Sequence, residues 1–336
     1  MKFLHIVPGT EDVANGMVVV AKLLAKEQGD AEVVDLNDVD RGKVAAADEV
    51  WVHGMWLPKE WLACWRALRA GKRLVRMTHG SLSPLYLKCQ SPFKKWLVGP
   101  IERWCLRRCS KIVATCEAEA EWIRAYEPRV KSIEVTDIKR FFNLSRVERV
   151  ERVDVSRKER KERKDDSRVE GRSFDSRVEH VDRVESGELH LLYLGRRHPL
   201  KGVEYLETAV KQIQESSAYS ASLRLCVKII SSAFGEELEK IWDWCDVLVL
   251  PTLSENFGLV IAEALERGKC VITTDGAPAW GENLSRVEHA DHVEGGEMLS
   301  GYGGRLIYLK GYRDGTPDLR INLLSSAISL ILGKQV

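Results

Sequence analysis

Residues 247–265 read VLVLPTLSENFGLVIAEAL, and this stretch gives the clearest indication of the fold. The four apolar residues 247–250 predict a short buried strand that ends at Pro251. The apolar spacing that follows predicts a helix over 259–267, and a second strand is expected at 270–273. Strand, helix and strand in this order indicate parallel strands in a sheet that is covered by helices.

The same alternation continues towards both ends of the chain. In the C-terminal half we expect strands at 189–194 and 223–230 and helices at 203–214 and 236–244. In the N-terminal half we expect strands at 3–7, 31–36, 49–53, 73–78 and 111–116, with helices that include 17–26 and 60–70. We therefore predict an α/β fold in which two Rossmann-like domains face a cleft.

A charged low-complexity segment separates the two halves. The tetrapeptide SRVE begins at residues 145, 167, 176 and 285, and residues 143–148 are identical to residues 283–288. Residues 145–187 hold 13 basic and 12 acidic residues, and valine is almost their only apolar residue. Because such a segment cannot offset its ordering entropy by burial, we expect a spacer. The predicted organisation is a domain over 1–142, an insert over 143–187 and a domain over 188–336.

The overall composition excludes several classes of protein. Lys and Arg number 51 against 50 Asp and Glu, a formal charge of +1, so we expect no nucleic-acid partner. No uncharged apolar run approaches the ~18 residues that cross a bilayer. The first residues, MKFLHIVPGT, lack the longer apolar segment of a secretory signal, and we expect a cytosolic protein.

The eight cysteines are scattered without a CxxC pair, which indicates neither a zinc knuckle nor a disulfide framework. Cys105 and Cys109 lie one helical turn apart, but no histidine is close to them in the sequence. We expect reduced thiols and no bound metal.

Charged residues follow two of the predicted C-terminal strands, where ligands gather in such folds. Arg196 and Lys201 lie in GRRHPLKG at 195–202, where flanking glycines let the backbone bend inward. We expect these cations to clamp a diphosphate. Glu255 precedes the next helix and Glu263 lies within it. Their eight-residue spacing predicts that both carboxylates face one cleft and accept hydrogen bonds from sugar hydroxyls.

The loop after the first predicted strand offers a further candidate. Gly16 opens the helix at 17–26, and a helix N-terminus approached by glycine can bind a phosphate. The absence of GxGxxG argues against a dinucleotide site. A simple turn glycine is the alternative.

The C-terminal motifs resemble those of a known family. GRRHPLKG, followed by PTLSENFGLVIAEAL at 251–265, resembles the donor-binding half of the family 4 (group 1) retaining glycosyltransferases with the GT-B fold. CVITTDGAP at 270–278 resembles the strand and loop that follow in that family. The resemblance is strong over 188–280 and looser over 1–125. It implies an acceptor-side domain at 1–142 and a nucleotide-sugar-binding domain at 188–336.

The resemblance also implies a role for each candidate residue. Arg196 and Lys201 would bind the diphosphate of a nucleotide-sugar and stabilise it as the leaving group, and Glu263 would hold the ribose hydroxyls. Glu255 would contact the donor sugar and the β-phosphate. The donor-binding set also includes Asn256, Phe257, Gly258 and Leu259, the last three through their backbone amides. Such transfer would need neither a metal nor another cofactor.

Two histidines stand where predicted N-terminal strands end, and each precedes a glycine. The segment THGSLSP at 78–84 resembles the place where family members carry a histidine or acid facing the sugar, so we predict that His79 is catalytic together with Arg196, Lys201 and Glu255. For His79 and His53 alike, the alternative is a histidine that satisfies loop backbone. His5 lies within a strand and is predicted to be structural.

Residues 93–108 combine aromatic side chains with an excess of cations. Either an interfacial helix on an anionic membrane or an amphipathic helix packed on the sheet would give this pattern, and Gly99-Pro100 is expected to interrupt it. The cations are Lys94, Lys95, Arg103, Arg107 and Arg108, against the single acid Glu102.

The expected function is transfer of a hexose, with retention, from a nucleoside-diphosphate sugar to a glycan or lipid-linked acceptor of the lipopolysaccharide type. Such a protein would work in polysaccharide biosynthesis, in the cytosol or at the inner face of the membrane. The alternatives are a nucleotide-sugar epimerase of the same fold and a non-catalytic nucleotide-sugar-binding or interaction protein.

Overall fold

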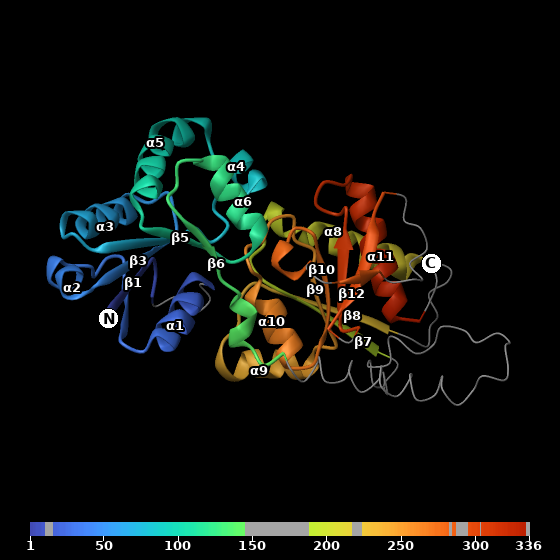
Figure 1. Cartoon of the computed structure of the whole chain (residues 1–336). Helices are drawn as coiled ribbons and strands as arrows, with labels where there is room; N and C mark the ends of the chain where they lie inside the picture. Colours follow the sequence, from blue (N-terminus) through green and yellow to red (C-terminus); the bar gives the residue numbers. More distant parts are fainter. Residues whose placement is uncertain are drawn as a thin grey trace, which may run out of the picture. The chain divides into compact units, whose positions relative to one another are not determined.

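The computed structural model describes residues 1–10, 16–144, 188–216, 224–281, 284–286, 295–302 and 304–333. The chain forms two compact units, Met1–Phe141 and Phe142–Val336 (Figure 1), and each is described by itself. Of the predicted insert 143–187, all but Asn143 and Leu144 lies outside the described residues.

The N-terminal unit is built on a six-stranded parallel sheet in the order β2-β1-β3-β4-β5-β6. The strands are β1 (Phe3–Val7), β2 (Ala31–Asp35), β3 (Glu49–His53), β4 (Arg73–Met77), β5 (Lys111–Ala114) and β6 (Ile133–Val135). The helices are α1 (Gly16–Gln28), α2 (Arg41–Ala46), α3 (Pro58–Arg69), α4 (Pro84–Cys89), α5 (Pro92–Arg108) and α6 (Glu117–Tyr126), followed by the 3-10 turn η1 (Ile138–Phe141).

Successive side chains of β1 point to opposite faces of the sheet and belong to two separate parts of the N-terminal core. Leu4 and Ile6 join the large cluster that includes residues of α3, α5 and α6, whereas Val7 packs with Val18 and Ala21 of α1. Successive side chains of a strand point to opposite faces, so His5 shares the α1 face with Val7. This placement brings a polar side chain into the layer between the sheet and α1.

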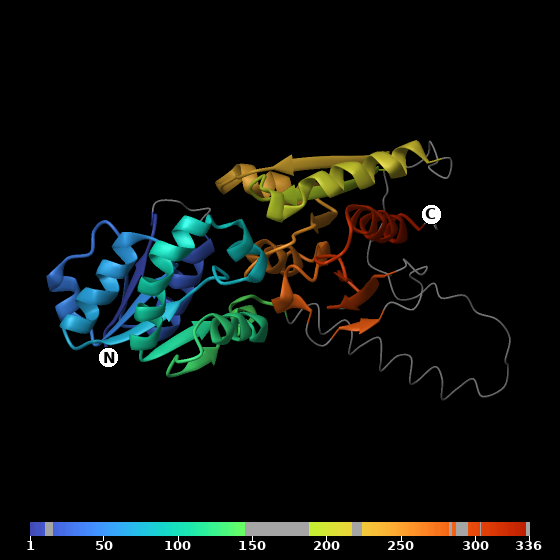
Figure 2. The ribbon, with the colours of Figure 1, turned by 90° about the horizontal axis from the view of Figure 1, so that it is seen from above.

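The C-terminal unit contains a seven-stranded sheet in the order β11-β12-β13-β10-β9-β7-β8. Its strands are β7 (Glu188–Leu194), β8 (Arg224–Ile230), β9 (Val247–Leu250), β10 (Cys270–Thr274), β11 (Ser285–Arg286), β12 (Glu297–Gly301) and β13 (Leu306–Lys310). The helices are α8 (Val203–Glu215), α9 (Gly235–Trp244), α10 (Leu259–Glu266) and α11 (Pro317–Ile331), with the 3-10 turns η2 (Pro199–Lys201) and η3 (Pro278–Trp280). Helices α8 and α11 lie side by side (Figure 2).

The predicted parallel arrangement is confirmed for the strands from β13 to β8, but β11 and β12 pair antiparallel. The second copy of the repeat supplies part of this edge, because Ser285 and Arg286 form β11 and pair with Ser300 and Leu299. Residues 287–294 lie outside the described part of the chain.

The expected interruption at Gly99-Pro100 is wrong. Helix α5 runs without a break from Pro92 to Arg108 and contains Pro100. Among the described residues, no helix is long and apolar enough to cross a membrane.

Candidate functional site

Two loops meet at the carboxyl ends of β7 and β9. The carbonyl of Leu200, in the loop after β7, accepts hydrogen bonds from the Leu253 N–H (2.8 Å) and the Thr252 hydroxyl (3.1 Å) in the loop after β9. Gly202 has φ +64°, and a Cβ at this position would lie 2.1 Å from the Pro251 carbonyl oxygen. The close approach of the loops therefore requires glycine at 202.

The loop after β10 joins the same cluster. The Glu255 N–H donates to the Gly276 carbonyl at 2.8 Å, and the Thr274 hydroxyl donates to the Thr252 carbonyl. The indole N–H of Trp280 donates to the Phe257 carbonyl. Three adjacent strands thus hold their following loops in one hydrogen-bonded group, where open α/β sheets bind ligands.

This group brings together two of the predicted catalytic residues. The ammonium of Lys201 donates to the carboxylate of Glu255, and each side chain is about one-fifth exposed. The Asn256 N–H lies 3.2 Å from the other oxygen of Glu255. The pair is an accessible juxtaposition of opposite charges rather than a sealed core contact.

The two arginines of the 195–202 loop differ in their surroundings. The Arg197 guanidinium pairs with Glu207 on α8. Arg196 is exposed, and its carbonyl accepts a hydrogen bond of 2.9 Å from the Tyr193 hydroxyl. Binding of an anion by Arg196 stays a prediction.

Two helices begin beside the Lys201–Glu255 pair. Helix α8 starts after Gly202 and α10 after Gly258 (φ +71°), and neither helix has a side-chain cap at its N-terminus. Uncapped N–H groups at a helix start carry a partial positive charge that favours anions. Lys201 and Glu255 therefore lie next to two helix N-termini suited to phosphate oxygens.

Glu263 lies on α10 and is half-buried, and burial raises the pKa of its carboxyl. The helix begins at Leu259, so Glu255 precedes it. Because only Glu263 is helical, helix rotation does not relate the two carboxylates, and their facing of one cleft stays a prediction. Of the other predicted donor-binding residues, Phe257 and Gly258 are buried and Asn256 and Leu259 are half-buried.

The N-terminal unit holds three histidines in a row. His5 Nε2 lies 2.7 Å from Gln28 Oε1, His5 Nδ1 lies 2.9 Å from His53 Nε2, and His53 Nδ1 lies 2.8 Å from His79 Nε2. Burial lowers the pKa of all three, to about 4 for His5 and about 3 for His79. We refer to Gln28, His5, His53 and His79 as the histidine chain, whose imidazoles are neutral at pH 7.

The order of donors in the histidine chain follows from its first member. With Gln28 Oε1 as assigned, His5 donates to it through Nε2 and must accept at Nδ1. His53 then donates through Nε2 and accepts at Nδ1, so His79 donates through Nε2. The remaining ring nitrogen, His79 Nδ1, therefore carries a lone pair.

Glu119 of α6 holds the loop that carries His79. Its buried carboxylate accepts from the Thr78 hydroxyl and the Gly80 N–H, both at 2.6 Å, and from the Thr115 N–H at 2.8 Å. His79 itself has φ +49°, a conformation that is uncommon outside glycine. Sequence reasoning missed Glu119 because its partners follow two different strands.

A buried ionic group beside this loop was also missed. The Arg76 guanidinium lies 3.1 Å from Glu102 and 3.7 Å from Glu60, and it donates to the Gly54 carbonyl at 3.0 Å. Burial raises the pKa of Glu60 to about 7, although the charge of Arg76 opposes this shift. An arginine within the apolar strand RLVRM was the signal that could have revealed the group.

Gly16 is the first residue of α1 and is exposed. Residues 11–15, which precede it, lie outside the described part of the chain. Gly16 and His79 belong to the N-terminal unit, whereas the Lys201–Glu255 pair belongs to the C-terminal unit.

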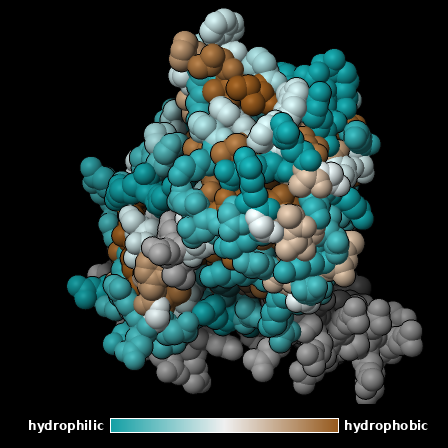
Figure 3. Space-filling view, turned by 90° about the vertical axis from the view of Figure 1, so that its left-hand side faces the viewer, coloured by the Kyte–Doolittle hydropathy of each residue, from teal (hydrophilic) through white to brown (hydrophobic). Residues whose placement is uncertain are grey.

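Helix α5 packs in the core on one side and exposes aromatic side chains near its start. Cys105 and Leu106 are buried and Glu102 pairs with Arg76, so one side packs in the core. Phe93 and Trp96 are 68% and 74% exposed. Figure 3 shows a group of apolar side chains at the top of the face in view, and α5 lies at the same height in Figure 1.

Comparisons with known proteins agree with this architecture. A glycosyl transferase 4-like domain matches residues 10–136, and a glycosyl transferases group 1 domain matches residues 188–295. Together they cover more than two thirds of the chain. The fold is GT-B, with two Rossmann-like domains. The chain belongs to the group 1 glycosyltransferases.

Solved structures share the fold at low sequence identity. A sucrose-phosphate synthase from Thermosynechococcus elongatus matches with a TM-score of 0.56 and 14% identity, covering 99% of this chain and 90% of that chain. An α,α-trehalose-phosphate synthase (UDP-forming) from Burkholderia vietnamiensis matches with a TM-score of 0.56 and 10% identity, covering 98% and 92%.

A curated relative is similar over a shorter stretch. An uncharacterized glycosyltransferase of Methanocaldococcus jannaschii is 28% identical over 110 residues. The match covers 27% of this chain and 28% of that relative's length.

Proposed function

We propose that this protein transfers a hexose, with retention, from a nucleoside-diphosphate sugar to an acceptor hydroxyl. The observation that carries the proposal is the Lys201–Glu255 ion pair beside the uncapped N-termini of α8 and α10. This arrangement supplies positive charge for a diphosphate and a carboxylate for a sugar next to each other.

In the proposed reaction the bond between the sugar C1 and the diphosphate oxygen breaks. A bond from C1 to the acceptor oxygen forms on the same face of the sugar, and the acceptor proton passes to the departing diphosphate. Lys201, Arg196 and the N–H groups at the start of α10 stabilise the charge that develops on the leaving group. The residues assigned here need no metal ion for that role.

The two carboxylates divide the recognition of hydroxyl groups. Glu263 accepts hydrogen bonds from the ribose, and the partly desolvated state that raises its pKa strengthens such bonds. Glu255 accepts from the donor sugar after Lys201 turns to the diphosphate. In the N-terminal unit, His79 Nδ1 accepts a hydrogen bond from a sugar hydroxyl, as its lone pair allows.

Two structural neighbours are named with sugar ligands. One is a trehalose-phosphate synthase from Burkholderia xenovorans in complex with glucose-6-phosphate, and an E. coli neighbour is bound with UDP-2-fluoro glucose. A nucleotide-sugar donor is the shared expectation. For the acceptor we propose a glycan or a lipid-linked sugar, and a sugar phosphate is the second candidate.

A membrane contact through α5 accompanies the proposed lipid-linked acceptor. Lys94 and Lys95 directly precede the exposed Trp96, and Glu102, the only acid of this helix, is paired with the buried Arg76. The outward side of α5 thus offers cations and aromatic rings, a combination that suits an anionic lipid surface.

Mass spectrometry of reaction mixtures tests the proposal. UDP-, GDP- and ADP-hexoses would be incubated with the protein and with lipid-linked sugars, oligosaccharides or sugar phosphates. Transfer predicts a free nucleoside diphosphate together with an acceptor that is heavier by one hexose. Epimers have equal mass, so the donor would also be resolved by chromatography. An epimerised donor with unchanged acceptor would identify an epimerase, and binding without any product would identify a non-catalytic binder.

A further inference from the structure

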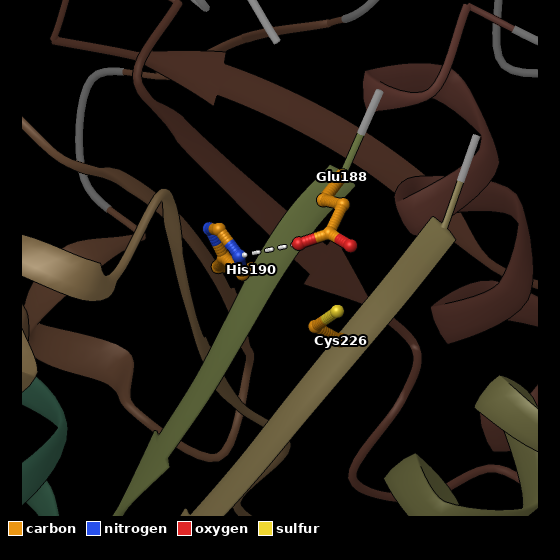
Figure 4. Close-up of side chains that lie close together, drawn as sticks. All are labelled: Glu188, His190 and Cys226. Carbon is orange, nitrogen blue, oxygen red and sulfur yellow. Dashed lines mark ion pairs between the residues drawn. The ribbon is translucent and has the colours of Figure 1, made fainter. Parts of the chain in front are cut away.

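Three side chains with metal-binding atoms meet on one face of the C-terminal sheet, at the start of β7. Glu188 and His190 are two residues apart on β7 and therefore point to the same face. Cys226 is the register partner of His190 on the neighbouring strand β8. All three are half-buried, and Figure 4 shows their side chains pointing toward one another.

The separations suit a single small cation. One ligand atom from each residue lies within 4.8 Å of the others, and His190 Nε2 is already 3.6 Å from Glu188 Oε2. Tetrahedral zinc with nitrogen, oxygen and sulfur ligands requires about 3.3–3.8 Å between ligand atoms. Small side-chain rotations of Glu188 and Cys226 would therefore complete the geometry.

A fourth residue orients the imidazole. Asp246 Oδ2 lies 3.1 Å from His190 Nδ1 and also accepts the His190 backbone N–H at 2.9 Å. With Nδ1–H donating to this carboxylate, Nε2 presents its lone pair to Glu188 and Cys226. A carboxylate that orients a histidine in this way is a common second layer of zinc sites.

We propose that Glu188, His190 and Cys226 bind one zinc ion, with Asp246 as a positioning residue and water in the fourth position. Thiolate and imidazole favour zinc over magnesium or calcium, which prefer oxygen ligands. The cysteine spacing predicted no bound metal, because the ligands proposed here come from two strands that no sequence motif joins. The proposed zinc site is also separate from the proposed transfer site. Glu188 begins β7 and the Arg196 loop follows its end, so seven residues of strand, about 20 Å, lie between them.

The ion would fasten β7 to β8, which forms an edge of the seven-stranded sheet. The competing arrangement is a purely ionic cluster, since the exposed Arg224 approaches Glu188 at 3.5 Å. An ionic cluster of this kind would not bind zinc through Cys226. Binding of zinc by the Cys226 thiol therefore distinguishes the zinc site from a purely ionic cluster.

The test is metal titration of the full chain, freed of metal by chelation, with calorimetry for zinc and absorption spectroscopy for cobalt(II). We expect one zinc per chain and, with cobalt, a thiolate charge-transfer band. Cys226→Ser should abolish that band, and His190→Ala should weaken zinc binding by roughly 100-fold. Asp246→Asn should weaken it by about 10- to 100-fold.

Cys89→Ser is the matched control, because Cys89 is an exposed free cysteine on the N-terminal unit and should leave the band and the zinc affinity unchanged. Nucleoside-diphosphate binding should be equal in all these variants, which separates the zinc site from the proposed transfer site. Zinc binding that is equal in Cys226→Ser and Cys89→Ser, or the absence of stoichiometric zinc binding, would overturn the proposal.

Discussion

The ammonium of Lys201 donates a hydrogen bond to the carboxylate of Glu255, although 54 residues separate them in the sequence. The sheet order places β7 beside β9, so the loops that follow these strands are neighbours. In the proposed reaction a diphosphate would compete with Glu255 for Lys201. We therefore expect donor binding to release the Glu255 carboxylate towards the sugar.

Lys201→Ala should lower turnover by roughly 100-fold or more, the scale for losing one electrostatic stabiliser in a preorganised site. Glu263→Ala should act mainly on donor affinity. Steady-state kinetics with the active donor would separate the two effects. Lys211→Ala is a suitable control, because Lys211 is an exposed α8 residue whose partner is Glu215. Small and equal losses of turnover in the Lys201 and Glu263 variants would contradict the assigned roles.

Glu255→Gln should have opposite effects on binding and on transfer. Removal of the carboxylate charge leaves Lys201 free for phosphate, so a nucleoside diphosphate without sugar should bind about fivefold more tightly, or ~1 kcal/mol. Transfer should fall, because the sugar loses a charged acceptor. Calorimetry with the diphosphate and turnover with the donor provide the two readouts. Weaker diphosphate binding would show that Glu255 supports the diphosphate instead of competing for its cation.

Gln28 should control the tautomer of His79 through the histidine chain. Gln28→Glu keeps an acceptor for His5, so we expect His79 to retain its proton on Nε2. Gln28→Leu removes the acceptor and should allow the other tautomer, with a loss in kcat/KM of about tenfold. Ring-nitrogen chemical shifts from NMR report the tautomer directly. Identical chemical shifts and kinetics in both variants would show that Gln28 does not control the tautomer of His79.

Glu60 should make the stability of the protein depend on pH. Its pKa in the folded protein is about 7, above the value of 4.5 for an unperturbed glutamate. Between these values the folded state holds more protons than the unfolded state, so the free energy of unfolding falls as pH rises. The full effect is about 3 kcal/mol.

Chemical denaturation of wild type and Glu60→Gln at pH 5 and pH 8 measures this contribution. The glutamine variant should gain stability relative to wild type as the pH rises, because it cannot ionise. Parallel pH curves for the two proteins would mean that Glu60 is already ionised at pH 5.

The α5 surface should bind anionic vesicles at low salt and release them as ionic strength rises, since exposed charges are screened over about 8–10 Å near physiological salt. Lys94→Gln with Lys95→Gln should weaken flotation with phosphatidylglycerol vesicles, and Trp96→Ala should weaken it at all salt concentrations. Arg103 and Arg107 are poorer choices, because they bond the Tyr126 carbonyl and Glu127. If the Lys94/Lys95 double variant floats with vesicles as wild type does, these lysines do not bind the membrane. That result would favour the alternative in which α5 only packs against the sheet.

Local patterns were sufficient for the central strands. The predicted strands 3–7, 49–53 and 247–250 agree with β1, β3 and β9 to the residue. Each is a short, mostly apolar stretch that is followed directly by a turn-forming proline or glycine. The antiparallel β12, EMLSG, was not predicted, since it carries few apolar residues and depends on pairing with β13. Strands of this kind are specified by their neighbours more than by their own sequence.

The candidate site likewise contains residues that local sequence could predict and residues that it could not. Arg196, Lys201 and Glu255 could be selected because they follow predicted strands. The histidine chain could not be predicted, since it joins α1 to β1, β3 and the loop after β4 through side-chain contacts. The Arg76 group likewise depends on packing of α3 and α5 against β4.

Calorimetric titration of wild type and Lys201→Ala with UDP-, GDP- and ADP-hexoses tests the central claim most directly. We expect one donor to bind wild type at one site per chain, and its dissociation constant to rise at least about tenfold in the variant, or ~1.4 kcal/mol. Circular dichroism and an unchanged melting temperature would show that the variant is folded. Absence of binding by every donor, or equal affinity in the two proteins, would contradict a nucleotide-sugar site at Lys201.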